Sequence, residues 1–317
     1  MSEKTSVKSG TVRVEIPAYA KINLYLDVLG CRDDGFHELL TVMHAISLHD
    51  DIIVQYTPAP VSEISLRIFG SRLPSDRRNL VFRAAEAFLE KTGLLARVYI
   101  TIRKKLPIAA GMAGGSSDAA ATLRALNEAA NRPLDEEALL ALGATLGSDV
   151  PFCLAGGTQI CRGRGERMQP LALHEPLHLL VVWGREHVST PRAFAEMDEY
   201  YHRFDGSVPH GTAPEHLFAA LESGTLAAAP ELLYNAFEPV VLPTCPQAAE
   251  MKERLLSLGA YAAHMSGSGP SVFGLFRTPD EARRAAIALG PRVRVLSSAP
   301  PLAMKVEHLP PRPSRVK

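Results

Sequence analysis

A loop rich in glycine and alanine constrains this sequence more than any other segment. It runs from Pro107 to Ser117, follows a strand-like run at 98–102 and opens into an alanine-rich helix pattern at 117–130. Small residues let the main chain approach a bulky anion, and a helix start leaves several N–H groups without partners. The segment therefore predicts a phosphate-binding loop, in a chain expected to handle nucleotide phosphates.

The loop matches neither of two common sequence motifs of nucleotide-binding loops. No Gly-Lys-Ser or Gly-Lys-Thr closes it, as a Walker A loop requires, and Gly-x-Gly-x-x-Gly does not occur. A tight turn at Gly114 and Gly115, with Ser116 as the helix cap, would explain the residues without a ligand. One hydroxyl suffices for a cap, however, so the second, on Ser117, is free for a phosphate oxygen or a metal.

Composition favours a two-domain α+β protein. The chain has 317 residues, 46% of them hydrophobic and 21% charged, as in ordinary globular proteins. Domains are expected at 1–170 and 171–317, because Gly, Arg and Pro accumulate between Gly163 and Pro176. A β-rich first part and β-α-β alternation in the second indicate the α+β class. Acidic and basic residues number 34 each, which argues against a nucleic-acid partner.

Cysteine usage and hydropathy favour a cytoplasmic protein. Cys31, Cys153, Cys161 and Cys245 show neither C-x-x-C spacing nor a disulfide framework, which fits a reducing compartment. The polar N-terminus lacks the apolar core of a signal peptide. No window approaches the roughly 18 apolar residues of a membrane span, so no membrane partner is expected.

Lys21, Asn23 and Asp149 are candidates for chemistry. Lys21 and Asn23 project from the same face of a predicted strand and can form a polar cluster, although a lysine at a surface strand edge is the alternative. Asp149 follows a predicted helix at 134–146, where a carboxylate meets the unfavourable end of the dipole. Two readings of Asp149 stay open: a turn residue bonding its own backbone, and a general base beside a lysine.

Two further segments indicate ligand contacts. Phe36 and His37 follow a glycine in a short loop, where they can stack on and hydrogen-bond a flat base; a structural histidine is the alternative. Gly267, Ser268 and Gly269 lie between two predicted strands. They form either a hairpin turn or a second backbone nest that braces an acceptor or its anions.

Taken in order, these segments resemble the GHMP kinase superfamily over roughly residues 12 to 307. The resemblance rests on Ala-Lys-Ile-Asn-Leu at 20–24, Arg-Asp-Asp-Gly-Phe-His-Glu-Leu at 32–39, the glycine loop, and Leu-Gly-Ser-Asp-Val-Pro-Phe at 146–152. It implies a two-domain GHMP kinase fold, with an N-terminal S5-like α/β domain and a C-terminal ferredoxin-like α+β domain. The segment at 32–39 is similar to that of members whose acceptor is a cytidine diphosphate methylerythritol.

The resemblance implies transfer of the γ-phosphoryl group of ATP to the 2-hydroxyl of 4-diphosphocytidyl-2-C-methyl-D-erythritol, in non-mevalonate isoprenoid precursor biosynthesis. Asp149 would accept the hydroxyl proton, and Lys21 would orient that aspartate. Alignment and charge neutralisation supply most of such a step. Mg²⁺ would arrive with ATP, with Ser117 a possible ligand and no separate protein metal cluster. A monomer or weak homodimer is expected.

The resemblance also assigns contacts. The main chain of the loop would hold the ATP phosphates, with two further residues near the adenosine; the nucleotide set is Asn79, Lys104, Pro107, Gly111, Ala113, Gly114, Gly115, Ser116 and Ser117. The acceptor set is Asn23, Phe36, His37, Thr190, Gly267, Ser268 and Gly269. Phe36 stands where tyrosine is usual, which removes a hydroxyl and keeps a ring for stacking. Thr190 before Pro191 is alternatively a good N-cap.

Other functions stay open. A homoserine or mevalonate-type kinase would share the fold, but the Gly-Phe-His segment favours an acceptor that carries a pyrimidine. A catalytically inactive sugar-nucleotide sensor would need neither Lys21 nor Asp149. The diphosphate of such an acceptor would attract an arginine. The sequence offers three candidates and does not indicate which of them reaches it: Arg162, Arg164 and Arg185.

Overall fold

The computed structural model describes residues 10–184, 186–204, 210–211, 213–290 and 293–310. Its strands are β1 (Thr11–Cys31), β2 (His37–Pro58), β3 (Glu63–Phe69), β4 (Ala96–Arg103), β5 (Thr158–Gly163), β6 (Arg167–Pro170), β7 (His178–Val182), β8 (Tyr234–Asn235), β9 (Ala262–Met265), β10 (Val272–Phe276), β11 (Val293–Ser297) and β12 (Lys305–Leu309).

The α-helices are α1 (Leu80–Thr92), α2 (Gly114–Ala129), α3 (Glu136–Leu146), α4 (Val150–Ala155), α5 (Thr190–Tyr201), α6 (Pro214–Ser223), α7 (Glu238–Val241), α8 (Pro246–Ser257) and α9 (Pro279–Leu289). Short 3-10 helices lie at His202–Phe204, Leu226–Ala228, Pro230–Leu232 and Leu242–Thr244. Among the described helices, none has both the length and the apolar character needed to cross a bilayer.

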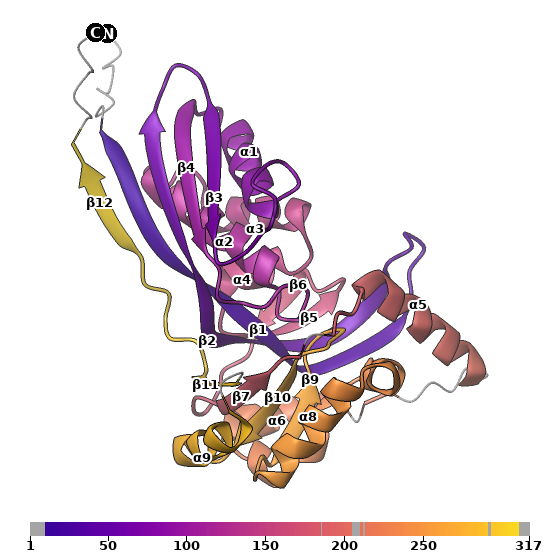
Figure 1. The fold of residues 1–317 in the computed structure, drawn as a ribbon. Coiled ribbons are helices and arrows are strands. Elements are labelled where there is room, and N and C mark those ends of the chain that lie inside the picture. Colours follow the sequence, from indigo (N-terminus) through magenta and orange to yellow (C-terminus); the bar gives the residue numbers. More distant parts are fainter. Residues whose placement is uncertain (1–9, 185, 205–209, 212, 291–292, 311–317) are drawn as a thin grey trace.

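Two sheets organise these elements (Figure 1). The larger has the order β12-β1-β2-β4-β3, with β5 beside β2, β6 beside β5 and β8 beside β1. The smaller has the order β11-β7-β10-β9. This arrangement of mixed sheets and helices confirms the predicted α+β class.

The hairpin of β1 and β2 is the frame of the molecule. The two strands pair antiparallel from Val12 opposite Tyr56 to Cys31 opposite His37, and Figure 1 shows them running from the upper sheet past the lower one. The register shifts between Tyr19 and Lys21 and again after Asn23. Such irregularities re-aim side chains locally. Lys21 and Asn23 therefore lie on a short segment that is set apart from the regular ladder.

Helices α1, α2 and α3 cover one face of the larger sheet. Alternation of buried and exposed positions along β4 turns one face of that strand toward the helices. Phe88, Ile100 and Leu123, from α1, β4 and α2, are fully buried in the resulting core. Alanine-rich α2 is buried over most of its length, so its first turn is held firmly where the cavity begins.

The smaller sheet is buried on both faces. All five residues of β10 are buried, which is expected when both faces of a strand are covered. Phe273 and Leu275 belong to the core shared with β1 and β2, whereas Val272 and Phe276 belong to the core shared with α8 and α9.

Strands from the second half of the chain also complete the larger sheet. β8 pairs parallel to β1 at Tyr25 and Tyr234, and β12 pairs antiparallel to β1 at Thr11 and Leu309. The division at 170/171 stays a prediction. Whatever its exact position, the two halves share β1.

The boundaries of several predicted elements differ from the structure. The apolar stretches at 39–48 and 52–56 belong to one continuous strand, β2. The helix predicted from 117 begins at Gly114. Helix α4 was not predicted, because its six residues are too few to show a helical period.

The buried core of the first half predicts a large cost for one truncation. Phe88→Ala should lower the free energy of unfolding by about 3–5 kcal/mol, since it leaves a cavity at a side chain with no exposed surface. Phe69→Ala, at a ring that is 45% exposed, is the matched control and should cost about 1 kcal/mol or less. Urea unfolding measures both, and equal costs would contradict this account of the core.

Candidate active site

A cavity of about 360 Å³ lies where the two halves of the chain meet. Segments far apart in sequence line it: β1, the glycine loop, Asp149 just before α4, α5, and the loop between β9 and β10. Of the predicted site residues, the lining contains Lys21, Asn23, Gly111, Ala113, Gly114, Gly115, Ser116, Asp149, Thr190, Gly267 and Ser268. The structure therefore brings most of the two predicted contact sets into one enclosure.

Lys21 and Asp149 meet in this cavity. The Lys21 Nζ lies 4.0 Å from Asp149 Oδ2, and the side chain of the lysine is only 6% exposed. Nζ also donates to Asn23 Oδ1 at 2.7 Å, and Asn23 Nδ2 donates to Thr41 Oγ1 at 2.8 Å. This chain of hydrogen bonds fixes the ammonium, so Lys21 is not a surface lysine at a strand edge.

The surroundings of Asp149 differ from the sequence prediction. Asp149 does follow α3, but it also immediately precedes α4 and occupies the N-cap position of that helix. The carboxylate therefore lies at the favourable end of the α4 dipole, and the prediction that it meets only an unfavourable end was wrong. Its side chain makes no capping hydrogen bond to α4, and it lines the cavity instead.

The glycine loop ends in the first turn of α2. The helix begins at Gly114, and its N-cap residue is Ala113 in the left-handed region (φ 57°, ψ 29°). Neither serine is the cap, so the alternative that assigned this role to Ser116 was wrong. Ser116 lines the cavity. The hydroxyl of Ser117, expected to be free, is buried and donates to Gly114 O at 3.0 Å.

The two glycine loops touch beside Lys21. A Cβ on Gly111 would collide with the carbonyl oxygen of Ser266, whose hydroxyl donates to Gly111 O at 3.0 Å. Gly267 has φ +57°, and a Cβ there would lie 3.0 Å from Gly111 O and 3.3 Å from Lys21 Nζ. Asn235 of β8 holds this second loop by donating to two of its carbonyls. The close approach requires glycine at both positions.

Thr190 faces the second loop. Its hydroxyl lies 2.9 Å from Ser268 Oγ, and both residues line the cavity. Helix α5 begins at Thr190, and its N-cap residue is Ser189. The alternative that Thr190 is the helix cap was therefore wrong. Gly269 lies next to this contact, outside the lining.

Phe36 and His37 lie at the turn between β1 and β2. His37 Nε2 is 2.7 Å from Asp198 Oδ1, and its ring stacks on Phe194 with centroids 4.4 Å apart. Phe36 is 50% exposed, and the guanidinium of Arg164 lies over its ring, 4.8 Å from the centroid. Phe194 and Arg164 both line the cavity, so the two predicted residues support its wall from behind.

Asn79 and Pro107 lie outside the cavity lining. Asn79 caps α1: its side-chain oxygen accepts from Val81 N at 3.0 Å, and its amide donates to Pro74 O at 2.9 Å. The structure thus gives Asn79 a local structural role, and its predicted contact with adenosine stays a prediction.

Lys104 lies beneath the glycine loop in a buried cluster of charges. Its ammonium is 2.9 Å from Asp118 Oδ2 and 2.5 Å from Asp50 Oδ2, and all three side chains are almost fully buried. Asp50 Oδ1 also accepts from the main chain of Leu106 at 2.9 Å. The cluster ties the start of α2 to β2 and to the strand that leads into the loop. It does not present Lys104 to the cavity.

The charge balance of this cluster shifts the pKa of Asp118. Burial raises this pKa to about 8; Lys104 opposes the rise and Asp50 adds to it. One oxygen of Asp118, Oδ1, is buried without a hydrogen-bond partner. Two carboxylates with one ammonium carry an excess negative charge, and a retained proton removes it.

Several cavity residues carried no sequence signal. Leu39, Thr41 and Met43 line it from β2, and Phe237 lines it from the segment before α7. On the sequence these are ordinary strand and core residues, and only the pairing of β1 with β2 places them beside Lys21. Arg164 was one of three open arginine candidates. Of the others, Arg162 is exposed and Arg185 lies outside the described residues.

Comparison with known proteins identifies the class first. The family model described as GHMP kinases N terminal domain matches residues 79–157, and that described as GHMP kinases C terminal matches 217–292. These matches cover the glycine loop, Asp149 and the second glycine loop. The class is therefore that of the GHMP kinases, as the resemblance predicted.

Relatives narrow the class. The chain is 44% identical to the 4-diphosphocytidyl-2-C-methyl-D-erythritol kinase of Pelotomaculum thermopropionicum over 270 residues, 85% of this chain and 91% of that protein. A crystal structure of 4-(cytidine 5'-diphospho)-2C-methyl-D-erythritol kinase matches with a TM-score of 0.75 and 36% identity, over 90% of this chain and 99% of that one. The chain belongs to the family of these kinases within the GHMP kinases.

A more distant structure shows that the fold alone does not determine the phosphate acceptor. A homoserine kinase from Cytophaga hutchinsonii matches with a TM-score of 0.70 at 19% identity, over 96% of this chain and 100% of that one. At this identity the match concerns the fold. Acceptor preference must therefore be argued from the cavity and from the nearer relatives.

The pKa of Asp118 predicts a pH-dependent stability. In an unfolded chain aspartate titrates near 3.9. The stability contributed by the proton on folded Asp118 is fully present below about pH 4 and is lost as pH rises toward its folded pKa of about 8. Between pH 5 and 8 the wild type should lose up to about 4 kcal/mol relative to Asp118→Asn, which cannot titrate.

Urea unfolding of both proteins at several pH values measures this difference. Asp33→Asn, at an exposed carboxylate, is the control and should keep the wild-type pH profile. An unchanged slope in Asp118→Asn would show that Asp118 is ionised in the folded protein throughout this range.

Proposed function

We propose that the protein is an ATP-dependent kinase that phosphorylates the 2-hydroxyl of 4-diphosphocytidyl-2-C-methyl-D-erythritol. The observation that carries the proposal is the meeting of Lys21 and Asp149, 4.0 Å apart, in a cavity lined by two glycine loops. The names of the relatives support the choice of acceptor, since the identity extends over most of both chains.

In the proposed reaction Asp149 accepts the proton of the acceptor hydroxyl as that oxygen attacks the γ-phosphorus of ATP. Lys21 is a buried cation next to Asp149, and its hydrogen bond to Asn23 keeps it in one position. It therefore orients the carboxylate and stabilises negative charge that develops on the transferred group. Since phosphoryl transfer depends on alignment, this fixed geometry supplies much of the rate.

The main chain from Gly111 to Ser116 is the proposed cradle for the ATP phosphates. Its N–H groups include those at the N-terminus of α2, which favour an anion through their partial positive charge. Asn79 and Lys104 are proposed to lie near the adenosine, and Pro107 is proposed to belong to the loop that holds the phosphates. None of these three residues lines the cavity in this structure.

Mg²⁺ is proposed to accompany ATP. Among the described residues, no group of three or more His, Cys, Asp or Glu could hold a metal by itself. The cavity does offer the oxygens of Ser116 and Asp149, the donor type that Mg²⁺ prefers beside phosphate. Ser117 fits less well, because its buried hydroxyl is bonded to Gly114. The ion would neutralise phosphate charge.

The acceptor is proposed to lie between the β1–β2 turn and the second glycine loop. Phe36 and His37 would contact the cytosine, and Asn23 the methylerythritol. Thr190 and the loop from Gly267 to Gly269 would close the other side. The enzyme is further proposed to act in the cytoplasm as a monomer or weak homodimer, without nucleic-acid or membrane partners.

Replacement of the proposed base should abolish turnover. Asp149→Asn keeps the shape of the side chain but cannot accept a proton, so kcat should fall at least about a hundredfold. ATP binding, measured by calorimetry, should survive. Asp280→Asn is the control and should retain full turnover, because its side chain is 71% exposed on α9, outside the cavity. Unchanged turnover in Asp149→Asn would exclude this residue as the base.

The choice of acceptor is tested by direct competition. Purified protein with ATP and Mg²⁺ should phosphorylate 4-diphosphocytidyl-2-C-methyl-D-erythritol and leave homoserine and mevalonate unmodified, since neither offers a pyrimidine. Mass spectrometry of the products distinguishes the three. Phosphorylation of homoserine or mevalonate alone would refute the proposed function.

A further inference from the structure

Arg164 is a cation in the cavity wall whose role has not yet been assigned. It lies in the turn between β5 and β6 and lines the same cavity as Lys21 and Asp149. The ammonium of Lys21 already has both Asn23 and Asp149 as partners. Among the described residues the guanidinium of Arg164 forms no ion pair within 4.0 Å of a carboxylate; it attracts Asp34 from a longer distance and lies over the ring of Phe36.

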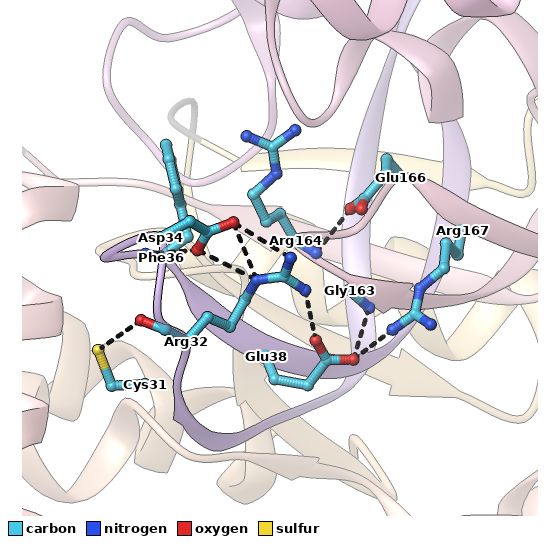
Figure 2. A network of polar contacts seen from close by, with 9 residues as sticks. All are labelled: Cys31, Arg32, Asp34, Phe36, Glu38, Gly163, Arg164, Glu166 and Arg167. Carbon is cyan, nitrogen blue, oxygen red and sulfur yellow. Dashed lines mark hydrogen bonds and ion pairs between the residues drawn. The ribbon is translucent and has the colours of Figure 1, made fainter.

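The carboxylates around Arg164 are engaged elsewhere (Figure 2). Glu38 accepts from the side chains of Arg32 and Arg167, and Asp34 pairs with Arg32 at 3.1 Å. Figure 2 shows the guanidinium of Arg164 turned away from Glu38 and Arg167, on the side toward which Phe36 also points. None of the hydrogen bonds and ion pairs of this network uses the guanidinium of Arg164, so its N–H donors are available for an anion.

The turn that carries Arg164 is fixed. Its main-chain N–H donates to Glu166 Oε2 at 2.6 Å, and Gly165 N donates to Arg162 O at 3.2 Å. Gly163 has φ +74°, and a Cβ there would meet the carboxylate of Glu166 at 2.7 Å. These contacts hold the backbone from which the Arg164 side chain extends.

The contact with Phe36 orients the guanidinium without using its hydrogen-bond donors. The guanidinium carbon lies 4.8 Å from the ring centroid, within the range of a cation–π contact. Stacking uses the flat face of the group, whereas its N–H donors point outward from the edge in a fork that matches phosphate oxygens. Phe36 thus serves as the support for Arg164.

We propose that Arg164 binds the diphosphate of the cytidyl acceptor and so selects a nucleoside diphosphate over a nucleoside. The inference rests on the proposed function, which supplies the acceptor. Its diphosphate lies between the cytosine and the methylerythritol, as Arg164 lies between the turn bearing Phe36 and the cavity bearing Asp149. The ATP phosphates have their own cradle at the start of α2.

Calorimetry with cytidine diphosphate and cytidine tests the subsite without turnover. The wild type should bind cytidine diphosphate about 10- to 100-fold more tightly than cytidine, as expected for charge-assisted hydrogen bonds. Arg164→Gln should lose this preference while its affinity for cytidine stays the same. Arg167→Gln, at a 63% exposed arginine paired with Glu38 in the same turn, is the matched control and should keep the preference.

The conservative variant Arg164→Lys keeps the positive charge but lacks the paired N–H donors of a guanidinium. It should retain only part of the preference for cytidine diphosphate over cytidine. It replaces the glutamine variant if that protein does not fold, as judged by circular dichroism. The inference is overturned if Arg164→Gln keeps the wild-type preference, if it loses affinity for both ligands alike, or if ATP binding weakens instead. A full preference in Arg164→Lys would overturn it as well.

Kinetics separate this inference from the proposed function. Arg164→Gln should raise the KM for the cytidyl acceptor about 10- to 100-fold and leave the KM for ATP unchanged. If the wild type phosphorylates the acceptor and its KM does not change in the variant, the subsite is refuted and the function stands. If the wild type selects cytidine diphosphate through Arg164 but transfers no phosphate, the function is refuted and the subsite stands.

Discussion

The contact between the two glycine loops is the constraint on which the cavity depends. Gly111 and Gly267 approach so closely that a methyl group at either would meet main-chain oxygen, and Ser266 bonds across the gap. One loop belongs to the first half of the chain and the other to the second. Their contact lies beside Lys21 Nζ, so the packing that joins the halves also sets the position of the central cation.

Buried charge organises the site at two levels. In the cavity wall, Lys21 faces the partly exposed carboxylate of Asp149. Beneath the loop, Lys104 is enclosed by Asp50 and Asp118, away from any ligand. Two lysines close to one glycine loop thus have different surroundings: the first faces Asp149 in the cavity, and the second holds the start of α2. Burial and partners distinguish them, whereas residue type does not.

Sequence reasoning predicted the α+β class, the glycine loop and the approach of Lys21 to Asp149, because motif order and resemblance reflect long-range packing. It failed for features that depend on local geometry, namely where a helix begins and which way a side chain points. Helix α4 was missed since six residues show no period, and the dipole argument for Asp149 failed with it. The hydroxyl of Ser117 was expected to be free, but the helix starts three residues earlier and turns it inward. The roles of the individual site residues stay predictions.

The long β1 strand limits how the molecule can move. It spans 21 residues, pairs with both β12 and β8, and carries Lys21 near its middle, where its register with β2 shifts. A hinge between the halves would have to break that strand and its ladder with β2. Opening and closing around ligands must then come from peripheral pieces such as α5, while the central lysine behaves as a fixed reference point.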